Sequence, residues 1–246
     1  MSNETARTAI VTGSSRGIGA AIAQRLAQDG FTVVINYAGS AAEAENLVAE
    51  IKREGGRAIS VQADVSDPAA MRRMFDQVSG ALGGVDVLVN NAGIMLLSTI
   101  ADTEDEAFDR QVAINLKGVF NGMREAAKRL RNGGRVISLS SSVVGRYPPT
   151  YAPYAATKAG VEAMTHILSK EFRGRNITVN AIGAGPTATD LFLKGKSQNQ
   201  IDELKKMAPL ERLGEPDDIA RVVSFLAGPD GAWINGQVLQ VNGGII

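Results

Sequence analysis

Short runs rich in valine and isoleucine alternate with longer, alanine-rich amphipathic stretches along almost the whole chain. This alternation is typical of repeated βαβ units, in which helices connect neighbouring parallel strands. The apolar runs are nearly continuous, as in residues 85–89, which indicates strands that are covered on both faces. The pattern predicts an α/β protein with a doubly wound, seven-stranded parallel sheet and helices on both faces.

The expected elements follow one another without a linker or an internal repeat, so we expect a single domain over residues 1–246. Strands are expected at residues 8–12, 32–36, 58–62, 85–90, 135–140, 178–182 and 238–241. Helices are expected at residues 17–29, 41–54, 68–80, 104–131, 153–172 and 216–227. The segment 183–215 lacks clear periodicity. Long loops in small domains often cover binding sites, so we expect a substrate lid near residues 187–212.

Composition excludes several classes of function. Lysine and arginine together number 26, as do aspartate and glutamate, so no net charge attracts the chain to nucleic acid or an anionic membrane. With no cysteine and one histidine, His166, the chain offers no basis for a thiolate or transition-metal site. Met1 to Arg7 are polar, and no apolar run approaches the roughly 18 residues of a membrane span. We expect a cytoplasmic protein without a signal peptide, and no metal.

A glycine-rich turn, TGSSRGIG at residues 12–19, joins the first expected strand to the first expected helix. Glycines at such a junction let the backbone turn tightly and approach a pyrophosphate. Free N–H groups and the positive end of the helix dipole stabilise that negative charge. A lone glycine-rich turn is more often only a turn, but this one opens a βαβ unit. We therefore expect a Rossmann fold that binds a dinucleotide.

Five motifs occur in an order that resembles the short-chain dehydrogenases and reductases. They are TGSSRGIG at 12–19, NNAG at 90–93, Asn115, serines at 140–142 before YAATK at 154–158, and residues 180–189. The resemblance covers nearly the whole chain. It implies hydride transfer between a nicotinamide cofactor and a carbonyl or alcohol substrate.

Charge at the end of the second strand predicts the cofactor. NAD sites usually carry a carboxylate there, which binds the ribose 2′-hydroxyl and repels a 2′-phosphate. Here the position holds Asn36, and the resemblance places Arg16 beside the adenosine ribose, where a guanidinium can pair with phosphate. The alternative for Arg16 is an ordinary solvated turn residue. We expect NADP(H), with NAD(H) as the alternative.

The resemblance implies a larger set of cofactor contacts. Asp64 matches the family's adenine pocket, although a helix-capping role also fits, whereas Asp67 fits a cap better. Asn90 is the strongest candidate in the NNAG turn. The expected cofactor-binding residues are Gly13, Ser15, Arg16, Gly17, Ile18, Gly19, Asn36, Asp64, Val65, Asn90, Ala92, Gly93, Tyr154, Lys158, Gly185, Thr187 and Thr189.

Tyr154 and Lys158 are four residues apart, so on a helix their side chains share one face. A nearby cation lowers the pKa of a phenol, by roughly 1 to 3 units at close range. We expect Tyr154 to act as the general acid or base, with Lys158 lowering its pKa. Taken alone, such a pair is usually a surface pair. Tyr151 lacks a matching lysine because Ala155 stands four residues later.

Two polar residues complete the expected catalytic set of Asn115, Ser141, Tyr154 and Lys158. The resemblance places the serine thirteen residues before the tyrosine, which selects Ser141, with Ser142 as the alternative. Its hydroxyl is expected to stabilise charge on the substrate oxygen. Asn115 lies in an apolar helix, where a lone amide is costly unless it is paired. By resemblance it holds a water linked to Lys158, and a buried packing amide is the alternative.

The expected substrate pocket is apolar and aromatic, which favours a hydrophobic ketone or aldehyde. Its residues are Met95, Leu96, Val143, Tyr147, Tyr151, Leu191 and Phe192. The resemblance also implies a homotetramer. A general carbonyl reductase competes with a sugar or polyol dehydrogenase, a nucleotide-sensing protein without chemistry, and a 3-oxoacyl carrier-protein reductase. The last requires a basic surface for its carrier, and the candidates are Lys128, Arg129, Arg131 and Arg173.

Overall fold

The seven strands form one all-parallel sheet in the order β3-β2-β1-β4-β5-β6-β7. Their bounds are β1 Thr8–Val11, β2 Thr32–Tyr37, β3 Arg57–Gln62, β4 Val85–Asn90, β5 Leu130–Ser141, β6 Thr178–Ala184 and β7 Val238–Val241. The computed structural model describes residues 7–246, so the polar segment before Arg7 lies outside the described residues. The predicted fold class is confirmed.

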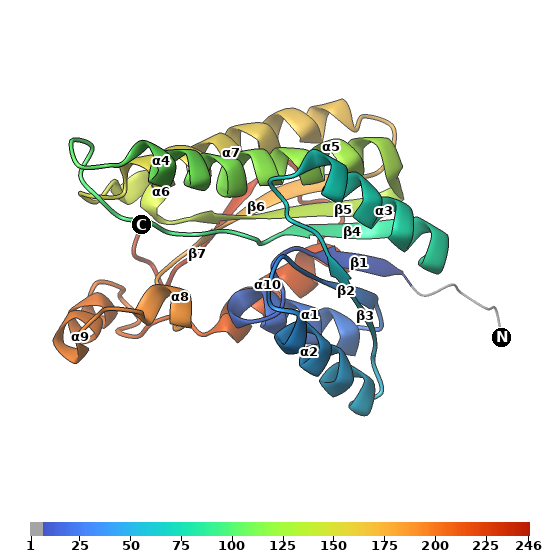
Figure 1. Cartoon of the computed structure of the whole chain (residues 1–246), viewed down its shortest axis with the longest axis horizontal. Helices are drawn as coiled ribbons and strands as arrows, with labels where there is room; N and C mark the ends of the chain where they lie inside the picture. The colour runs from blue at the N-terminus through green and yellow to red at the C-terminus, as the bar shows by residue number, and fades with distance from the viewer. Residues whose placement is uncertain (1–6) are drawn as a thin grey trace.

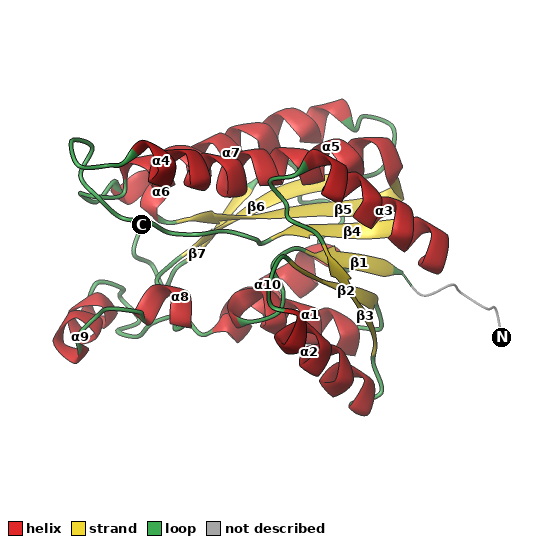
Figure 2. Ribbon diagram, in the orientation of Figure 1, coloured by secondary structure: helices red, strands yellow, loops and turns green. Residues whose placement is uncertain are grey.

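Helices cover both faces of the sheet, as Figures 1 and 2 show. One layer holds α1 (Gly17–Gln28), α2 (Ala41–Arg53) and α10 (Pro216–Ala227). The other holds α3 (Pro68–Leu82), α5 (Gly118–Arg129) and α7 (Ala152–Glu171). Each layer has its own apolar core, and alternate residues of β1 and β4 belong to different cores. This arrangement explains the continuous apolar runs in the central strands.

Local sequence signals set the ends of several helices. At the start of α3, the Asp67 carboxylate accepts a hydrogen bond from the backbone N–H of Ala69 at 2.8 Å, and Pro68 occupies the first helical position. The helix ends at Gly83, whose φ of 78° lies in the left-handed region. The interpretation of Asp67 as a cap is confirmed.

The helix expected over residues 104–131 differs in the structure. It consists of α4 (Asp105–Gln111), a π-helical segment η1 (Val112–Lys117) and α5, and its last two expected residues belong to β5. π-helical turns inside α-helices occur often at functional sites. This one contains Asn115.

The segment 183–215 contains structure that the sequence analysis missed. The strand β6 continues to Ala184, and two short helices follow, α8 (Asp190–Leu193) and α9 (Gln198–Lys206). A capping box between Ser197 and Gln200 starts α9, and this pair of residues is a sequence signal for a helix N-terminus. In Figure 1, α8 and α9 project from the end of the sheet that carries the C-terminus. A further short helix, α6 (Val143–Arg146), follows β5.

The strand order reverses between β1 and β4, which are neighbours in the sheet. In open α/β sheets ligands bind at the carboxyl ends of the strands beside such a point. The loops after β1, β4, β5 and β6 therefore meet around one crevice. Among residues 7–246, none of the helices is long and apolar enough to cross a membrane.

Candidate active site

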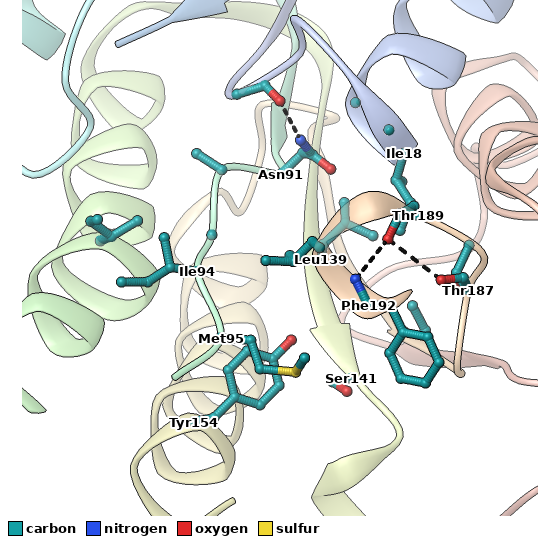
Figure 3. Close-up of a pocket in the computed structure, with 18 of the residues that line it drawn as sticks. Ile18, Asn91, Ile94, Met95, Leu139, Ser141, Tyr154, Thr187, Thr189 and Phe192 are labelled. Carbon is teal, nitrogen blue, oxygen red and sulfur yellow. Dashed lines mark hydrogen bonds between the residues drawn. The ribbon is translucent and has the colours of Figure 1, made fainter. Parts of the chain in front are cut away.

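A cavity of about 730 Å³ lies at the carboxyl ends of the strands and runs from Asn36 and Asp64 to Tyr154 and Phe192. Figure 3 shows its central part, with Ile18 and Thr189 on one side and Tyr154 and Met95 at the other end. The expected residues that line it are Gly13, Ser15, Arg16, Gly17, Ile18, Gly19, Asn36, Asp64, Val65, Ala92, Gly93, Ser141, Tyr154, Lys158, Gly185, Thr187 and Thr189. Asn90 and Asn115 do not line it.

The glycine-rich turn has the backbone geometry of a phosphate cradle. Gly13 and Gly17 have φ values of 60° and 58°, which favour glycine over other residues. A Cβ on Gly13 would lie 2.8 Å from the Cα of Ala92, and one on Gly19 would lie 2.5 Å from Nδ2 of Asn91. Within the described residues, no side chain caps the first turn of α1, and that turn carries no acidic residue. Its N–H groups are therefore available to an anion.

Asn36 lines the cavity, and its amide is also bonded to the backbone of the glycine-rich turn. It is buried, its Oδ1 accepts from the N–H of Gly13 at 3.1 Å, and its Nδ2 donates to the carbonyls of Val61 and Ala63. These bonds occupy the amide, so it shapes the turn. Tyr37 is the next residue along β2 and lines the cavity, followed by Ala38, Gly39 and Ser40.

Asn90 is corrected by the structure. It is buried, and its Nδ2 donates to the Ser138 hydroxyl at 3.1 Å, on the side of the sheet that faces α5. Asn91, which the sequence analysis left out, lines the cavity instead. Its Nδ2 donates to the carbonyls of Thr12 and Gly13 at 2.9 and 3.0 Å, and Figure 3 draws one of these two bonds. Asn91 therefore ties the end of β4 to the glycine-rich turn.

The tyrosine, lysine and serine meet at the opposite end of the cavity. Tyr154 and Lys158 lie one turn apart on α7, and the Lys158 Nζ is 5.6 Å from the centroid of the Tyr154 ring. Nζ donates a hydrogen bond to the carbonyl of Leu139 at 2.7 Å. Ser141, at the end of β5, lines the same part of the cavity, and its side chain acts to lower the pKa of Tyr154.

The neighbouring serines have other partners. Ser140 donates to the Glu162 carboxylate at 2.6 Å. Ser142 is buried, and its backbone N–H donates to the carbonyl of Ala184. The geometry therefore favours Ser141 over Ser142 as the serine beside Tyr154.

Burial sets the protonation of the pair. Loss of hydration raises the pKa of Tyr154 to about 12, although the hydrogen bond from Ser141 acts in the opposite direction. Burial also lowers the pKa of Lys158 to about 8. Desolvation is the largest influence on the pKa of Tyr154, and the expected lowering of that pKa by Lys158 stays a prediction. At neutral pH, Tyr154 keeps its proton and Lys158 is mostly charged.

This lysine predicts a pH dependence. As the pH rises through about 8, Lys158 loses its charge, so kcat/KM for the nicotinamide substrate should fall in the alkaline limb. A Lys158→Arg variant keeps its charge over this range, and its kcat/KM, although lower, should show no decline between pH 7 and 9. Initial rates across that range for both proteins test the prediction. The same decline in the arginine variant would contradict it.

Asn115 holds the loop that follows β4. It is fully buried, its Oδ1 accepts from the N–H of Ile94 at 2.9 Å, and its Nδ2 donates to the carbonyl of Ile94 at 2.8 Å. A Cβ on Gly93 would lie 3.3 Å from Oδ1 of Asn115 and 3.8 Å from Nζ of Lys158. The side chain thus has the partner that a buried amide needs, and it positions the cavity wall beside the lysine.

The wall beside Tyr154 is largely the expected one. Met95, Val143, Tyr151, Leu191 and Phe192 line the cavity. Leu96 and Tyr147 do not, and this part of the prediction is wrong. The Tyr147 side chain is 68% exposed, because left-handed backbone at that residue turns it away after α6. Further lining residues that the sequence analysis missed include Arg110, Ile114, Arg146, Pro148, Leu204 and Met207.

Among the residues that the structure describes, no group of three or more His, Asp or Glu side chains is arranged to hold a metal ion. His166 lies on α7 beyond Lys158 and outside the cavity lining.

Comparison with known proteins identifies the family. The sequence model of the family described as enoyl-(acyl carrier protein) reductase matches residues 13–246. A short-chain type dehydrogenase/reductase of Picea abies is 45% identical, over 97% of this chain and 92% of its own length. This chain is a short-chain dehydrogenase/reductase.

Two further members of the family are similar to it. The NADPH-dependent aldehyde reductase-like protein of Arabidopsis thaliana, described as chloroplastic, is 46% identical over 98% of this chain and 94% of its own length. A crystal structure of a short-chain dehydrogenase from Burkholderia cenocepacia, in complex with NADP, has a TM-score of 0.92 at 40% identity. The match between the two structures covers 99% of this chain and 99% of the Burkholderia chain. Both the fold and the family predicted from the sequence are confirmed.

Proposed function

We propose that this short-chain dehydrogenase/reductase is an NADPH-dependent carbonyl reductase that acts on aldehydes or ketones. The observation that carries the proposal is the meeting of Tyr154, Ser141 and Lys158 at one end of a cavity whose other end is a phosphate cradle. The Arabidopsis relative named as an aldehyde reductase supports the substrate class. NADPH bound in the cradle supplies the hydride.

The protein's own residues supply the proton and hold the substrate. Tyr154 donates its proton to the oxygen of the carbonyl as negative charge develops there. Ser141 donates a hydrogen bond to the same oxygen. Lys158 brings a positive charge close to Tyr154 and to the developing negative charge. Asn115 acts through Ile94, by fixing the wall beside these groups.

The protonated form of Tyr154 suits the role of proton donor in the reductive direction. A pKa of about 12 leaves the hydroxyl protonated at neutral pH, which is the form that gives a proton to an alkoxide. Oxidation of an alcohol needs the phenolate, which the buried site disfavours until positive charge is brought near it.

Charge around the adenosine end supports NADP(H). Among the lining residues from Asn36 to Ser40, none is a carboxylate. The Arg16 side chain is 69% exposed and its NH1 is 3.8 Å from the Glu43 carboxylate, a separation that leaves it free to take a phosphate. The Burkholderia structure contains NADP. NAD(H) remains the alternative cofactor.

Replacing Arg16 with glutamine tests the cofactor assignment. Loss of a charged hydrogen bond to the 2′-phosphate should weaken NADPH binding by about 10-fold or more, whereas NADH binding should change by less than about 2-fold. Fluorescence titration of both nucleotides measures this. Equal losses for NADPH and NADH would show that Arg16 does not bind the 2′-phosphate.

The carrier-protein reductase is the weaker alternative, because two of the four residues of its expected basic surface pair with carboxylates. Arg129 pairs with Asp76 and Glu125, and Arg131 pairs with Asp86. Such pairs leave little positive field for an acidic carrier.

We also propose a homotetramer, a lid over the substrate formed by residues 187–212, and a cytoplasmic location. Large apolar side chains are exposed on α4, α5 and α7, including Phe108, Phe120 and Ile167, and Trp233 before β7 is 98% exposed. Exposed apolar surface of this kind supports association. Light scattering after gel filtration measures the assembly. The Arabidopsis relative is described as chloroplastic, so the location is tested separately by imaging a fluorescent fusion.

The function itself is tested by following the absorbance of NADPH, and separately NADH, with aldehydes, ketones, an acetoacetyl thioester and sugars. Turnover of aldehydes or ketones with NADPH supports the proposal. Turnover confined to the thioester would select the carrier-protein reductase. Tight NADPH binding without turnover of any compound would favour the alternative of a nucleotide-sensing protein without chemistry.

A further inference from the structure

One cationic side chain in the substrate half of the cavity has no acidic partner. Arg146, the last residue of α6, lines the cavity and is partly buried. In the part of the chain that the structure describes, no carboxylate lies within ion-pair distance of its guanidinium. Its one side-chain hydrogen bond goes to the Met207 sulfur at 3.6 Å, and a thioether is a weak acceptor.

The surroundings make this arginine unusual. The other lining residues around it are mostly apolar or aromatic: Met95, Val143, Pro148, Tyr151, Leu191, Phe192, Leu204 and Met207. Two carboxylates line the whole cavity, Asp64 at the adenine end and Asp190, which is exposed and makes no ion pair with Arg146 within residues 7–246. Within residues 7–246 this guanidinium has no acidic partner and is still partly exposed, so an anionic ligand group can reach it and pair with it.

Arg146 also lies close to the reacting groups. Burial raises the pKa of Tyr151, and the positive charge of Arg146 opposes that rise, so the charge is felt at the Tyr151 hydroxyl. The Tyr151 ring packs edge-on against Tyr154, with centroids 6.3 Å apart. Arg146, Tyr151 and Tyr154 therefore line one cavity, in which Tyr151 packs against the proton donor.

We propose that Arg146 binds a carboxylate of the substrate, and that the enzyme prefers carbonyl compounds in which an apolar body separates the reacting carbonyl from that carboxylate. The inference rests on the proposed carbonyl reductase and names its substrate class. Met207 follows α9, so an anion on Arg146 replaces the contact that now joins α6 to the segment after α9.

The test compares 4-formylbenzoate with its uncharged methyl ester in wild type, Arg146→Gln and Arg146→Lys, with NADPH. The glutamine variant should lose about 10- to 100-fold in kcat/KM for the carboxylate, mainly through KM, and less than about 3-fold for the ester. The lysine variant should recover part of the loss, since it restores a point charge but not the planar fork. Equal effects on both compounds would overturn the proposal.

Arg110→Gln is the matched control, because Arg110 lines the same cavity from α4 and is exposed. Loss of the carboxylate preference in this variant, with the preference kept in Arg146→Gln, would overturn the assignment to Arg146. A second measurement does not depend on turnover: calorimetric binding of 4-formylbenzoate to the NADP⁺-loaded protein. Weaker binding in Arg146→Gln supports the inference even if neither compound is reduced, in which case the proposed reductase activity alone fails. Unchanged binding overturns the inference.

Discussion

Tyr154→Phe should reduce kcat for aldehyde reduction by about 100- to 10,000-fold, the range that a positioned proton donor contributes. The substitution removes one oxygen atom and keeps the ring, which packs against Tyr151. NADPH binding should change by less than about 3-fold, because the phosphate cradle lies at the other end of the cavity. Steady-state kinetics and fluorescence titration of NADPH together measure the two effects.

Tyr151→Phe is the matched control for this experiment. Tyr151 lines the same cavity, and four residues after it stands Ala155 in place of a lysine. Its loss should leave kcat within about 10-fold of wild type, since it affects packing and not the proton transfer. Comparable losses in the two variants, or a Tyr154→Phe protein with more than a tenth of wild-type turnover, would contradict the assigned role.

Gly19→Ala should impair both folding and cofactor binding. The added Cβ would lie 2.5 Å from Nδ2 of Asn91, 2.7 Å from the Gly13 carbonyl and 2.8 Å from the Cα of Ser14, two of which are rigid backbone atoms. Overpacking of this kind lowers the free energy of unfolding by about 1 to 3 kcal/mol. It also displaces Asn91, whose bonds fix the carbonyls of Thr12 and Gly13. NADPH affinity should therefore fall by at least about 10-fold, an effect of about 1.4 kcal/mol on binding.

The glycine effect has an internal comparison in Gly80→Ala. Gly80 lies in α3, does not have a positive φ, and has open space where a Cβ would stand. Alanine has the higher helix propensity, so this variant should gain up to about 1 kcal/mol in stability. Denaturant unfolding with and without NADPH measures both proteins. Normal NADPH binding by Gly19→Ala would show that the turn does not need its close packing.

The sequence contained the elements of the fold because buried parallel strands leave continuous apolar runs. All six residues of β4 are buried, as is typical of a parallel strand that helices cover on both faces. The spacing of Tyr154 and Lys158 likewise places them on one helix face, as the structure has them. The short helices α8 and α9 were missed because a few turns of helix carry too little periodicity to detect.

Side-chain direction at strand ends was the main source of error. Leu88 and Asn90 face the core that includes α5, so Asn91 is the residue that turns toward the glycine-rich loop. On β2 the Asn36 amide donates to the carbonyls of Val61 and Ala63, and Tyr37, the next residue, lines the cavity with it. Successive residues of a strand point to opposite faces, and this rule, applied to the strand bounds, predicts the outcome at Asn90.

The protonation of the site was beyond the sequence for a different reason. Spacing alone indicated that Lys158 stands near Tyr154, but the pKa of each group depends on how much water surrounds it. Only the structure shows that both are buried and that the Lys158 Nζ is bonded to the Leu139 carbonyl. The position of Arg146 in the cavity likewise could not be predicted from the sequence, because it follows from the kinked backbone of α6.

The central claim is hydride transfer from NADPH to a carbonyl carbon within this cavity. The most direct measurement incubates the enzyme with an aldehyde and NADPH deuterated on each face of C4 in turn, and reads deuterium in the alcohol by mass spectrometry. One of the two labelled cofactors should place a single deuterium on the carbinol carbon of the alcohol. The alcohol made with the other labelled cofactor should contain no deuterium. An alcohol free of deuterium with both cofactors, or no alcohol from any carbonyl compound despite NADPH binding, would contradict the account.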